Sequence, residues 1–238
     1  MGEMTLDALR DGSRLLFDKP LYWTSFDLVN KVRWVLRKAT GIKKIKVGHA
    51  GTLDPLATGL MVVCTGRETK GIEGLMGLDK EYVATLRLGS TTPSFDLETE
   101  TDAEFPTEHI TDELLEKRLS SMVGEQMQVP PAFSAKFIEG KRAYELARKG
   151  EGREPAPVKI VIREIEVLSR NGNDVVVRVL CSKGTYVRSL ARDIGIALDS
   201  GAHLAALRRT AIGDFRVEDA ETPADFEKFV TLMKQTPS

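Results

Sequence analysis

The sequence predicts an α+β fold with a mixed, largely antiparallel central sheet flanked by helices. Strand-like and helix-like segments alternate irregularly, without the repeated βαβ order of a parallel sheet. Residues 162–168 and 175–181 are apolar strand segments joined by a turn that contains Gly172, which predicts an antiparallel hairpin. Residues 82–88 alternate between apolar and polar side chains, as a half-buried strand does.

A helix is expected over residues 26–39. Thr24 is a good N-cap because its hydroxyl can accept a hydrogen bond from a free N–H of the first turn. Val29, Val32 and Leu36 then recur at a spacing that places them on one face. This face predicts a helix packed on the sheet.

Two more helices are expected nearer the end of the chain. One follows Gly184 and carries an apolar stripe that continues to Leu198. The other is a short helix at about 223–234, preceded by Thr222 as N-cap and opened by Pro223.

The length of 238 residues allows one large domain or two small ones, and we expect a single domain over residues 1–238. Proline and glycine cluster at both margins of residues 130–157, around a short basic helical patch at 142–148. This pattern predicts an inserted flap on the surface of the domain. A rigid excursion without a role is the alternative.

The charges are balanced overall, with 34 Lys and Arg against 35 Asp and Glu and a net charge of −1. Seven basic residues nevertheless lie between Lys31 and Leu53, with no acidic residue among them. Clustered cations on a neutral chain fit a shaped phosphate-binding surface. They fit a solvated helix face equally well, so charge alone does not decide.

Several classes of protein are excluded or disfavoured. Cys64 and Cys181 are far apart and each ends an apolar run, which favours buried free thiols over a disulfide or a zinc site. No signal peptide and no apolar run of about 18 residues is visible, so we expect a cytoplasmic protein that does not cross a membrane. The three histidines form no ligand pattern, and no metal is expected.

The most unusual segment is the loop Gly48–Leu60, which contains Asp54 followed by Pro55. Its glycines allow close approach of the backbone to a ligand, and the proline restricts Asp54 to an extended conformation. No Gly-Lys-Ser/Thr sequence follows, so the loop does not have the spacing of a nucleotide-binding phosphate loop. By itself, an Asp-Pro pair is most often a simple turn.

This loop resembles the catalytic signature of the tRNA pseudouridine-55 synthase (TruB) family. Other stretches resemble that family in the right order, from about Leu16 to Arg216, which is nearly the whole chain. They are Asp18-Lys19-Pro20, Trp23-Thr24-Ser25-Phe26, Lys80-Glu81-Tyr82, Leu88-Gly89, Pro130-Pro131-Ala132-Phe133-Ser134-Ala135, Gly140-Lys141-Arg142-Ala143-Tyr144-Glu145, Cys181–Leu190, Gly201-Ala202-His203 and Leu207-Arg208-Arg209.

The resemblance implies the pseudouridine synthase fold and an isomerase that acts without metal or organic cofactor. Asp54 matches the catalytic aspartate, which attacks either the uracil ring or C1′; the sequence leaves both routes open. Arg188 matches the arginine that pairs with this carboxylate and orients it. Tyr82 matches the tyrosine that stacks on the target base and helps to move a proton from C5.

The resemblance also implies how RNA is held. His49, Tyr186 and Leu207 match positions that contact the flipped nucleotide, and flipping is needed because a stacked base is inaccessible. Lys19 is expected to bind substrate, and the flap to clamp the T arm of tRNA. Weaker contacts to the RNA backbone are expected from Lys43, Lys44, Lys46, Lys141 and Arg142.

The sequence departs from the family pattern at its end. Only about 20 residues follow Arg216, too few for the RNA-binding PUA domain that many members carry. We therefore expect a PUA-less bacterial type that relies on contacts with the T arm. We also expect a monomer that needs no protein partner.

Two rivals remain. One is a non-catalytic helper of RNA folding, and the other is the guide-RNA-dependent relative, whose subunit needs protein partners.

Overall fold

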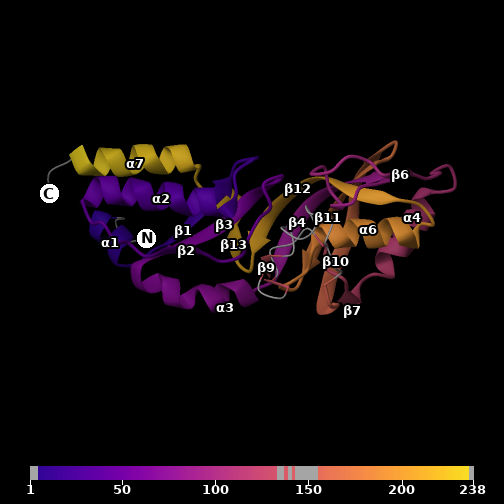
Figure 1. The fold of residues 1–238 in the computed structure, drawn as a ribbon, viewed down its shortest axis with the longest axis horizontal. Coiled ribbons are helices and arrows are strands. Elements are labelled where there is room, and N and C mark those ends of the chain that lie inside the picture. Colours follow the sequence, from indigo (N-terminus) through magenta and orange to yellow (C-terminus); the bar gives the residue numbers. More distant parts are fainter. Residues whose placement is uncertain (1–4, 133–136, 139–140, 143–154, 236–238) are drawn as a thin grey trace. The chain divides into compact units, whose positions relative to one another are not determined.

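The computed structural model describes residues 5–132, 137–138, 141–142 and 155–235 (Figure 1). The chain divides into two compact units. Unit 1 comprises Met1–Lys80 and Arg208–Ser238, and unit 2 comprises Glu81–Leu207. The expectation of a single domain over the whole chain stays a prediction.

The sheet of unit 1 is built on two long antiparallel strands. They are β1 (Arg14–Lys19) and β3 (Ala57–Thr65), paired so that Lys19 lies opposite Gly59. β2 (Val47–His49) also pairs with β3. β12 (Ala202–Ile212) pairs with the other edge of β3. The last residues of β12 belong to unit 1 and form a hairpin with β13 (Phe215–Arg216).

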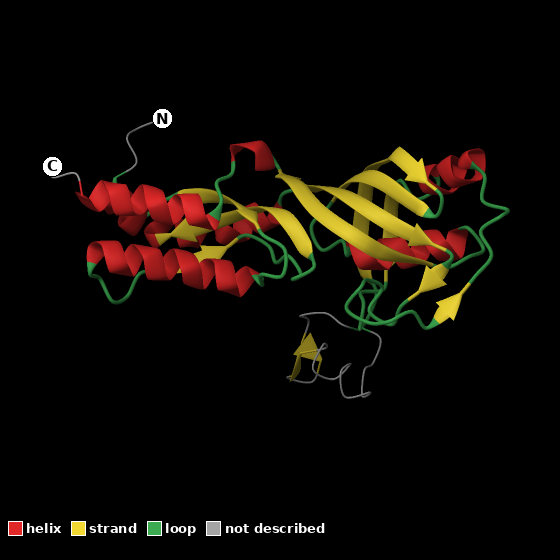
Figure 2. Cartoon of the chain, turned by 90° about the horizontal axis from the view of Figure 1, so that it is seen from above, coloured by secondary structure: helices red, strands yellow, loops and turns green. Residues whose placement is uncertain are grey.

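The helices of unit 1 confirm two sequence predictions. α2 (Ser25–Thr40) begins at a capping box formed by Thr24 and Asp27, and ends at Gly41 in the left-handed conformation. α7 (Pro223–Gln235) lies beside α2 in both views (Figures 1 and 2). The remaining helices are α1 (Leu6–Asp11), α3 (Ile72–Gly77), and the 3₁₀ turns Gly66–Gly71 and Val217–Asp219.

The core of unit 1 forms where these helices meet the sheet. Leu28, Val32 and Leu36 of α2 are fully buried, as the predicted apolar face requires. Phe17 of β1 meets Phe226 of α7 edge to face, with ring centroids 5.3 Å apart.

The sheet of unit 2 contains the predicted hairpin. β10 (Val158–Asn171) and β11 (Asp174–Cys181) are antiparallel, and Gly172 takes φ +59° in the turn between them. The order continues from β12 through β4 (Lys80–Leu88), β11 and β10 to β7 (Gly124–Gln128). β4 alternates between buried and less buried residues as predicted.

The remaining elements of unit 2 are shorter. β5 (Ser90–Thr91) pairs with β6 (Ala103–Glu104), and the helices in the described residues of unit 2 are α4 (Asp112–Ser120) and α6 (Val187–Ala197). The apolar stripe predicted after Gly184 is the buried side of α6. The mixed, mostly antiparallel sheet with helices confirms the predicted α+β class.

The predicted flap at 130–157 falls largely outside the described residues, including the basic helical patch. Within it, β8 (Phe137–Ile138) pairs with β9 (Lys141–Arg142). Cys64 and Cys181 are buried and are not joined in a disulfide, as predicted. In the described part of the chain, no helix is long and apolar enough to span a membrane.

Candidate active site

Asp54 lies in an irregular loop between β2 and β3 and is half-buried. The loop is fixed to the first turn of α2 through Ser25. The Ser25 hydroxyl accepts a hydrogen bond from the N–H of Leu53 (2.8 Å) and donates one to the Leu53 carbonyl (3.0 Å). The N–H of Ala57 donates to the Asp54 carbonyl (3.0 Å). The backbone on both sides of the carboxylate is therefore held in place.

A buried arginine of β12 supports the same loop from the other side. Arg209 is 1% exposed, and its Nε donates to the carbonyl of Leu60 at 2.8 Å. Its two terminal nitrogens donate to the carbonyls of Gly51 (3.1 Å) and Thr52 (3.4 Å). One guanidinium thus satisfies carbonyls before and after Asp54.

Lys19 is completely buried at the end of β1. Its ammonium donates to the carbonyls of Trp23 (2.6 Å) and Pro20 (2.9 Å). Burial lowers the pKa of Lys19 to about 8, and the negative charge of Asp54 partly opposes this shift. The expectation that Lys19 binds substrate stays a prediction. Lys19 places a titratable positive charge near Asp54.

His49 ends β2, shortly before the loop. Burial, followed by the nearby charge of Arg209, lowers the pKa of His49, so the neutral imidazole is favoured at pH 7. Its Nδ1 is buried and has no hydrogen-bond partner among the described residues. The imidazole is therefore neutral and has a buried nitrogen whose hydrogen-bonding capacity is unsatisfied in the described part of the chain.

Unit 1 carries one more ion pair near the loop. Arg208 donates through both terminal nitrogens to the Asp18 carboxylate, at 3.0 Å and 2.7 Å. The same guanidinium lies 3.5 Å from the hydroxyl of Thr58. The pair joins β1 to β12 and fixes the strand ends that flank the loop.

The other predicted catalytic residues belong to unit 2. Tyr82 is nearly buried on β4, and Arg188 is buried on α6. Tyr186, at the N-cap of α6, exchanges two backbone hydrogen bonds with the side-chain amide of Gln128. Leu207 lies half-buried on β12. The structure therefore carries Asp54 in one unit and Tyr82 and Arg188 in the other, and the pairing of Asp54 with Arg188 stays a prediction.

Arg188 has an acidic neighbour that sequence reasoning missed. Its Nε lies 3.5 Å from a carboxylate oxygen of Asp96, and Nη1 donates to the carbonyl of Ser94 (3.4 Å). The loop that carries Asp96 is tight, because Phe95 takes φ +63° and its ring lies under Arg192. An arginine within the apolar face of a helix signals a buried acidic partner, but sequence alone does not say which one.

Arg209 was also missed as a functional residue. Its position in a β-strand with flanking polar residues carries no local sign of burial, because its partners are carbonyls of a loop about 150 residues earlier. Only the three-dimensional pairing of β3 with β12 reveals its role.

The basic segment divides into two parts. Lys31 pairs with Glu227, and Arg33 donates to Asn30 and to the Val47 carbonyl, so these two cations serve the fold. Lys43, Lys44 and Lys46 are exposed, whereas the side chains of Lys141 and Arg142 lie outside the described part.

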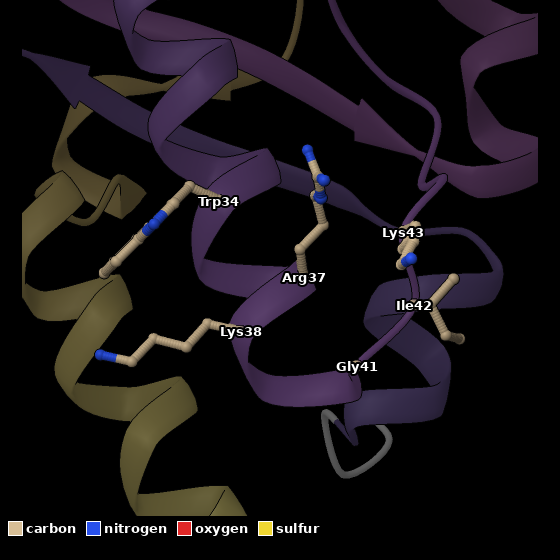
Figure 3. Close-up of a pocket in the computed structure, with 6 residues that line it drawn as sticks. All are labelled: Trp34, Arg37, Lys38, Gly41, Ile42 and Lys43. Carbon is tan, nitrogen blue, oxygen red and sulfur yellow. The ribbon is translucent and has the colours of Figure 1, made fainter.

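Of these exposed cations, Lys43 lines a shallow pocket of about 380 Å³ at the C-terminal end of α2 (Figure 3). Its lining is Trp34, Arg37, Lys38, Gly41, Ile42 and Lys43. The helix rises about 24 Å over its 16 residues, so this pocket is well separated from the Asp54 loop at the other helix end.

Comparisons with known sequences cover most of the chain. Residues 37–187 match the N-terminal domain of the TruB family pseudouridylate synthases, and residues 188–238 match the C-terminal domain of tRNA pseudouridylate synthase B. The chain is 57% identical over 221 residues to tRNA pseudouridine synthase B of Phocaeicola vulgatus, covering 93% of this chain and 94% of the relative. It is 50% identical to the protein of that name from Flavobacterium johnsoniae, over 94% and 99% of the two chains.

Solved structures agree with this relationship. A chain of a Cbf5–Nop10–Gar1 complex superimposes with a TM-score of 0.73 and 28% identity, covering 98% of this chain. A chain of an H/ACA RNP bound to a substrate RNA containing 2′-deoxyuridine gives 0.69 and 27%, over 96% of this chain. This chain spans only 58% and 56% of those two longer chains. The predicted pseudouridine synthase fold is confirmed.

Proposed function

The chain belongs to the TruB family of pseudouridylate synthases, and from this membership we propose that it converts the T-loop uridine at position 55 of tRNA to pseudouridine. The relatives that share half or more of its residues are named as tRNA pseudouridine synthases, which supports tRNA as the substrate. The reaction breaks the bond between N1 of uracil and C1′ of ribose, rotates the base, and forms a bond between C5 and C1′. The proton on C5 is then lost and N1 gains one, so the product is an isomer.

Asp54 is proposed as the nucleophile. Its carboxylate attacks either the uracil ring or C1′, and both routes need a carboxylate held within a narrow range of positions. The observation that carries this proposal is the loop itself: Ser25 holds Leu53, and Arg209 holds Gly51 and Thr52. A side chain on such a restrained backbone loses little freedom on reaching the transition state.

Arg188 and Tyr82 are proposed to complete the site. Arg188 would orient the Asp54 carboxylate, and Asp96 would in turn hold the guanidinium in place. Tyr82 would stack on the target uracil and assist proton transfer at C5. His49, Tyr186 and Leu207 are proposed to line the space that receives the flipped nucleotide, with His49 available as a neutral hydrogen-bonding group.

We further propose that the enzyme works in the cytoplasm as a monomer, without a protein partner, metal or organic cofactor. Purified protein would then form pseudouridine in unmodified tRNA transcript when nothing but buffer and salt is added. A requirement for a second protein or a guide RNA would contradict this part of the proposal.

Replacement of Asp54 by Asn tests the nucleophile. Asp54→Asn keeps the size of the side chain but removes its charge, so we expect no detectable pseudouridine at position 55 in single-turnover assays. Asp214→Asn, which changes an exposed aspartate of the β12–β13 turn, is the matched control and should retain full activity. Position-resolved mapping of pseudouridine supplies the measurement. Undiminished activity of Asp54→Asn would contradict the proposal.

A further inference from the structure

Beside the Asp54 loop, one exposed aromatic residue has a backbone conformation that tyrosine rarely adopts. Tyr22 has φ +66°, in the left-handed region where a side chain with a Cβ is strained. The residue is 74% exposed, so packing in a core does not explain why a bulky side chain occupies this position. Glycine or asparagine would meet the backbone requirement more easily.

The strained residue is tied directly to the candidate catalytic loop. The N–H of Tyr22 donates to the carbonyl of Pro55 at 2.8 Å, and Pro55 is the residue after Asp54. The chain on either side is also held, because Lys19 donates to the carbonyls of Pro20 and Trp23. The backbone that carries the Tyr22 ring is therefore held in place. A single hydrogen bond joins it to Pro55, the residue that follows Asp54.

The surroundings of Tyr22 in the sequence are also unusually apolar for a surface. Leu21 is 43% exposed and Phe26 is 64% exposed, so three large exposed apolar side chains occur within six residues. Single exposed apolar residues are common, but a group next to a functional loop indicates a contact surface.

We propose that Tyr22 is a stacking platform for an RNA base that flanks the target uridine. This inference rests on the proposed action on RNA, and adds a contact outside the pocket for the flipped base. When one base leaves its stack, its neighbours lose a stacking partner, and an aromatic ring at the same place can replace it. Stacking on an aromatic side chain is sequence-tolerant and needs no charge, which suits an exposed ring with apolar neighbours.

Two substitutions separate the ring from the strain. Tyr22→Gly removes both the ring and the conformational conflict, so the protein should bind RNA more weakly while its Tm is unchanged or higher. Tyr22→Phe keeps the ring and loses only the hydroxyl, so it should bind as the wild type does. Phe229→Leu changes an exposed aromatic residue of α7 and serves as the control for loss of a surface ring.

The measurements are the Kd of a fluorescent T-arm hairpin by anisotropy, kcat/KM on tRNA transcript, and Tm. For Tyr22→Gly we expect the Kd to rise, and kcat/KM to fall, by about five-fold or more. The ratio of its Kd to that of the wild type should stay constant as salt is raised, because stacking releases no counterions. Tyr22→Phe and Phe229→Leu should stay within about two-fold of the wild type on the same scale.

Three results would each overturn the inference. They are wild-type affinity in Tyr22→Gly, equal weakness of Tyr22→Phe and Tyr22→Gly, and a Tm several degrees lower in Tyr22→Gly. The measurement of Kd does not depend on catalytic turnover. Full activity of Asp54→Asn would therefore end the proposed function and still leave the Tyr22 result readable.

Discussion

Arg188 and Asp96 form a buried ion pair in unit 2, with Nε 3.5 Å from the carboxylate oxygen. Both side chains are almost inaccessible to water, so neither charge can be satisfied by solvent. The N–H of Glu98 donates to the other Asp96 oxygen (2.9 Å), which fixes the carboxylate in turn. The Asp96 loop therefore helps to fix the position of the Arg188 guanidinium.

The first prediction concerns Asp96→Asn. The substitution keeps the shape of the side chain but removes the charge that Asp96 places beside the Arg188 guanidinium, so the guanidinium should shift. A misplacement of about 1 Å can cost on the order of 100-fold in rate. We expect a fall of this order in single-turnover kcat.

The control for this prediction is Asp102→Asn, at an exposed aspartate of unit 2 that bonds to Thr91. It should leave the rate unchanged. Wild-type kcat in a folded Asp96→Asn protein would show that Arg188 does not need this partner.

The second prediction concerns Arg209. In Arg209→Met the three carbonyls it binds lose their donor inside the protein, and each buried unsatisfied group costs about 1–3 kcal/mol. We expect a loss of stability of about 3 kcal/mol or more in urea unfolding, together with a fall in kcat.

Arg209→Lys is the informative companion. Lysine keeps the positive charge but lacks the planar guanidinium that reaches three carbonyls at once. The loss of stability should therefore be smaller than in Arg209→Met, whereas kcat should be as low as in that variant. If Arg209→Lys restored kcat fully, charge rather than the fork geometry would be what the loop needs.

The third prediction follows from the lowered pKa of Lys19, which is about 8 in the folded protein against 10.5 for an unperturbed lysine. The positive charge near Asp54 is present below pH 8 and lost above it. We therefore expect kcat/KM to decline above about pH 8 in the wild type, as the charge disappears.

Lys19→Met should be less active than the wild type below pH 8, where the wild type carries the charge, and should lack this decline. Stability should show the opposite trend, because the folded state binds fewer protons than the unfolded state between pH 8 and 10.5. The contribution of Lys19 to the free energy of unfolding therefore rises with pH across this range. A decline in kcat/KM that persists unchanged in Lys19→Met would assign it to another group.

The fourth prediction concerns the exposed cluster Lys43, Lys44 and Lys46. Reversal of all three charges to Glu should weaken binding of tRNA and flatten its dependence on salt, because fewer counterions are released. The measurement is the slope of log Kd against log salt concentration. Lys228→Glu, on α7, is the control cation. An unchanged slope in the triple variant would show that the cluster faces only solvent.

Much of the fold followed from local patterns. The capped apolar face of α2, the hairpin turn at Gly172 and the Thr222–Pro223 start of α7 were all predicted within one or two residues. Each depends on residues close in sequence, where hydrogen bonding and periodicity act directly. The irregular loop at Asp54 followed in the same way from the proline after it.

The site was less predictable, because its supporting contacts are made between distant segments. From the sequence alone, Lys19 is expected to be an exposed cation. In the structure it is buried, and its ammonium donates hydrogen bonds to two carbonyls. Arg209 and Asp96 carry no local signal of burial. Their roles depend on which strands pair and which loops pack, and spacing along the chain does not encode that information.

At residue 59 of unit 1, the structure has room only for glycine. Gly59 takes φ +105°, and a Cβ added there would lie 2.3 Å from the carbonyl oxygen of Arg209 on the adjacent strand. Even alanine at residue 59 would push β3 and β12 apart. β3 follows Asp54, and β12 carries Arg209, which supports the Asp54 loop. A saturation library should consequently return glycine alone at residue 59 among active clones, although no atom of that residue takes part in the reaction.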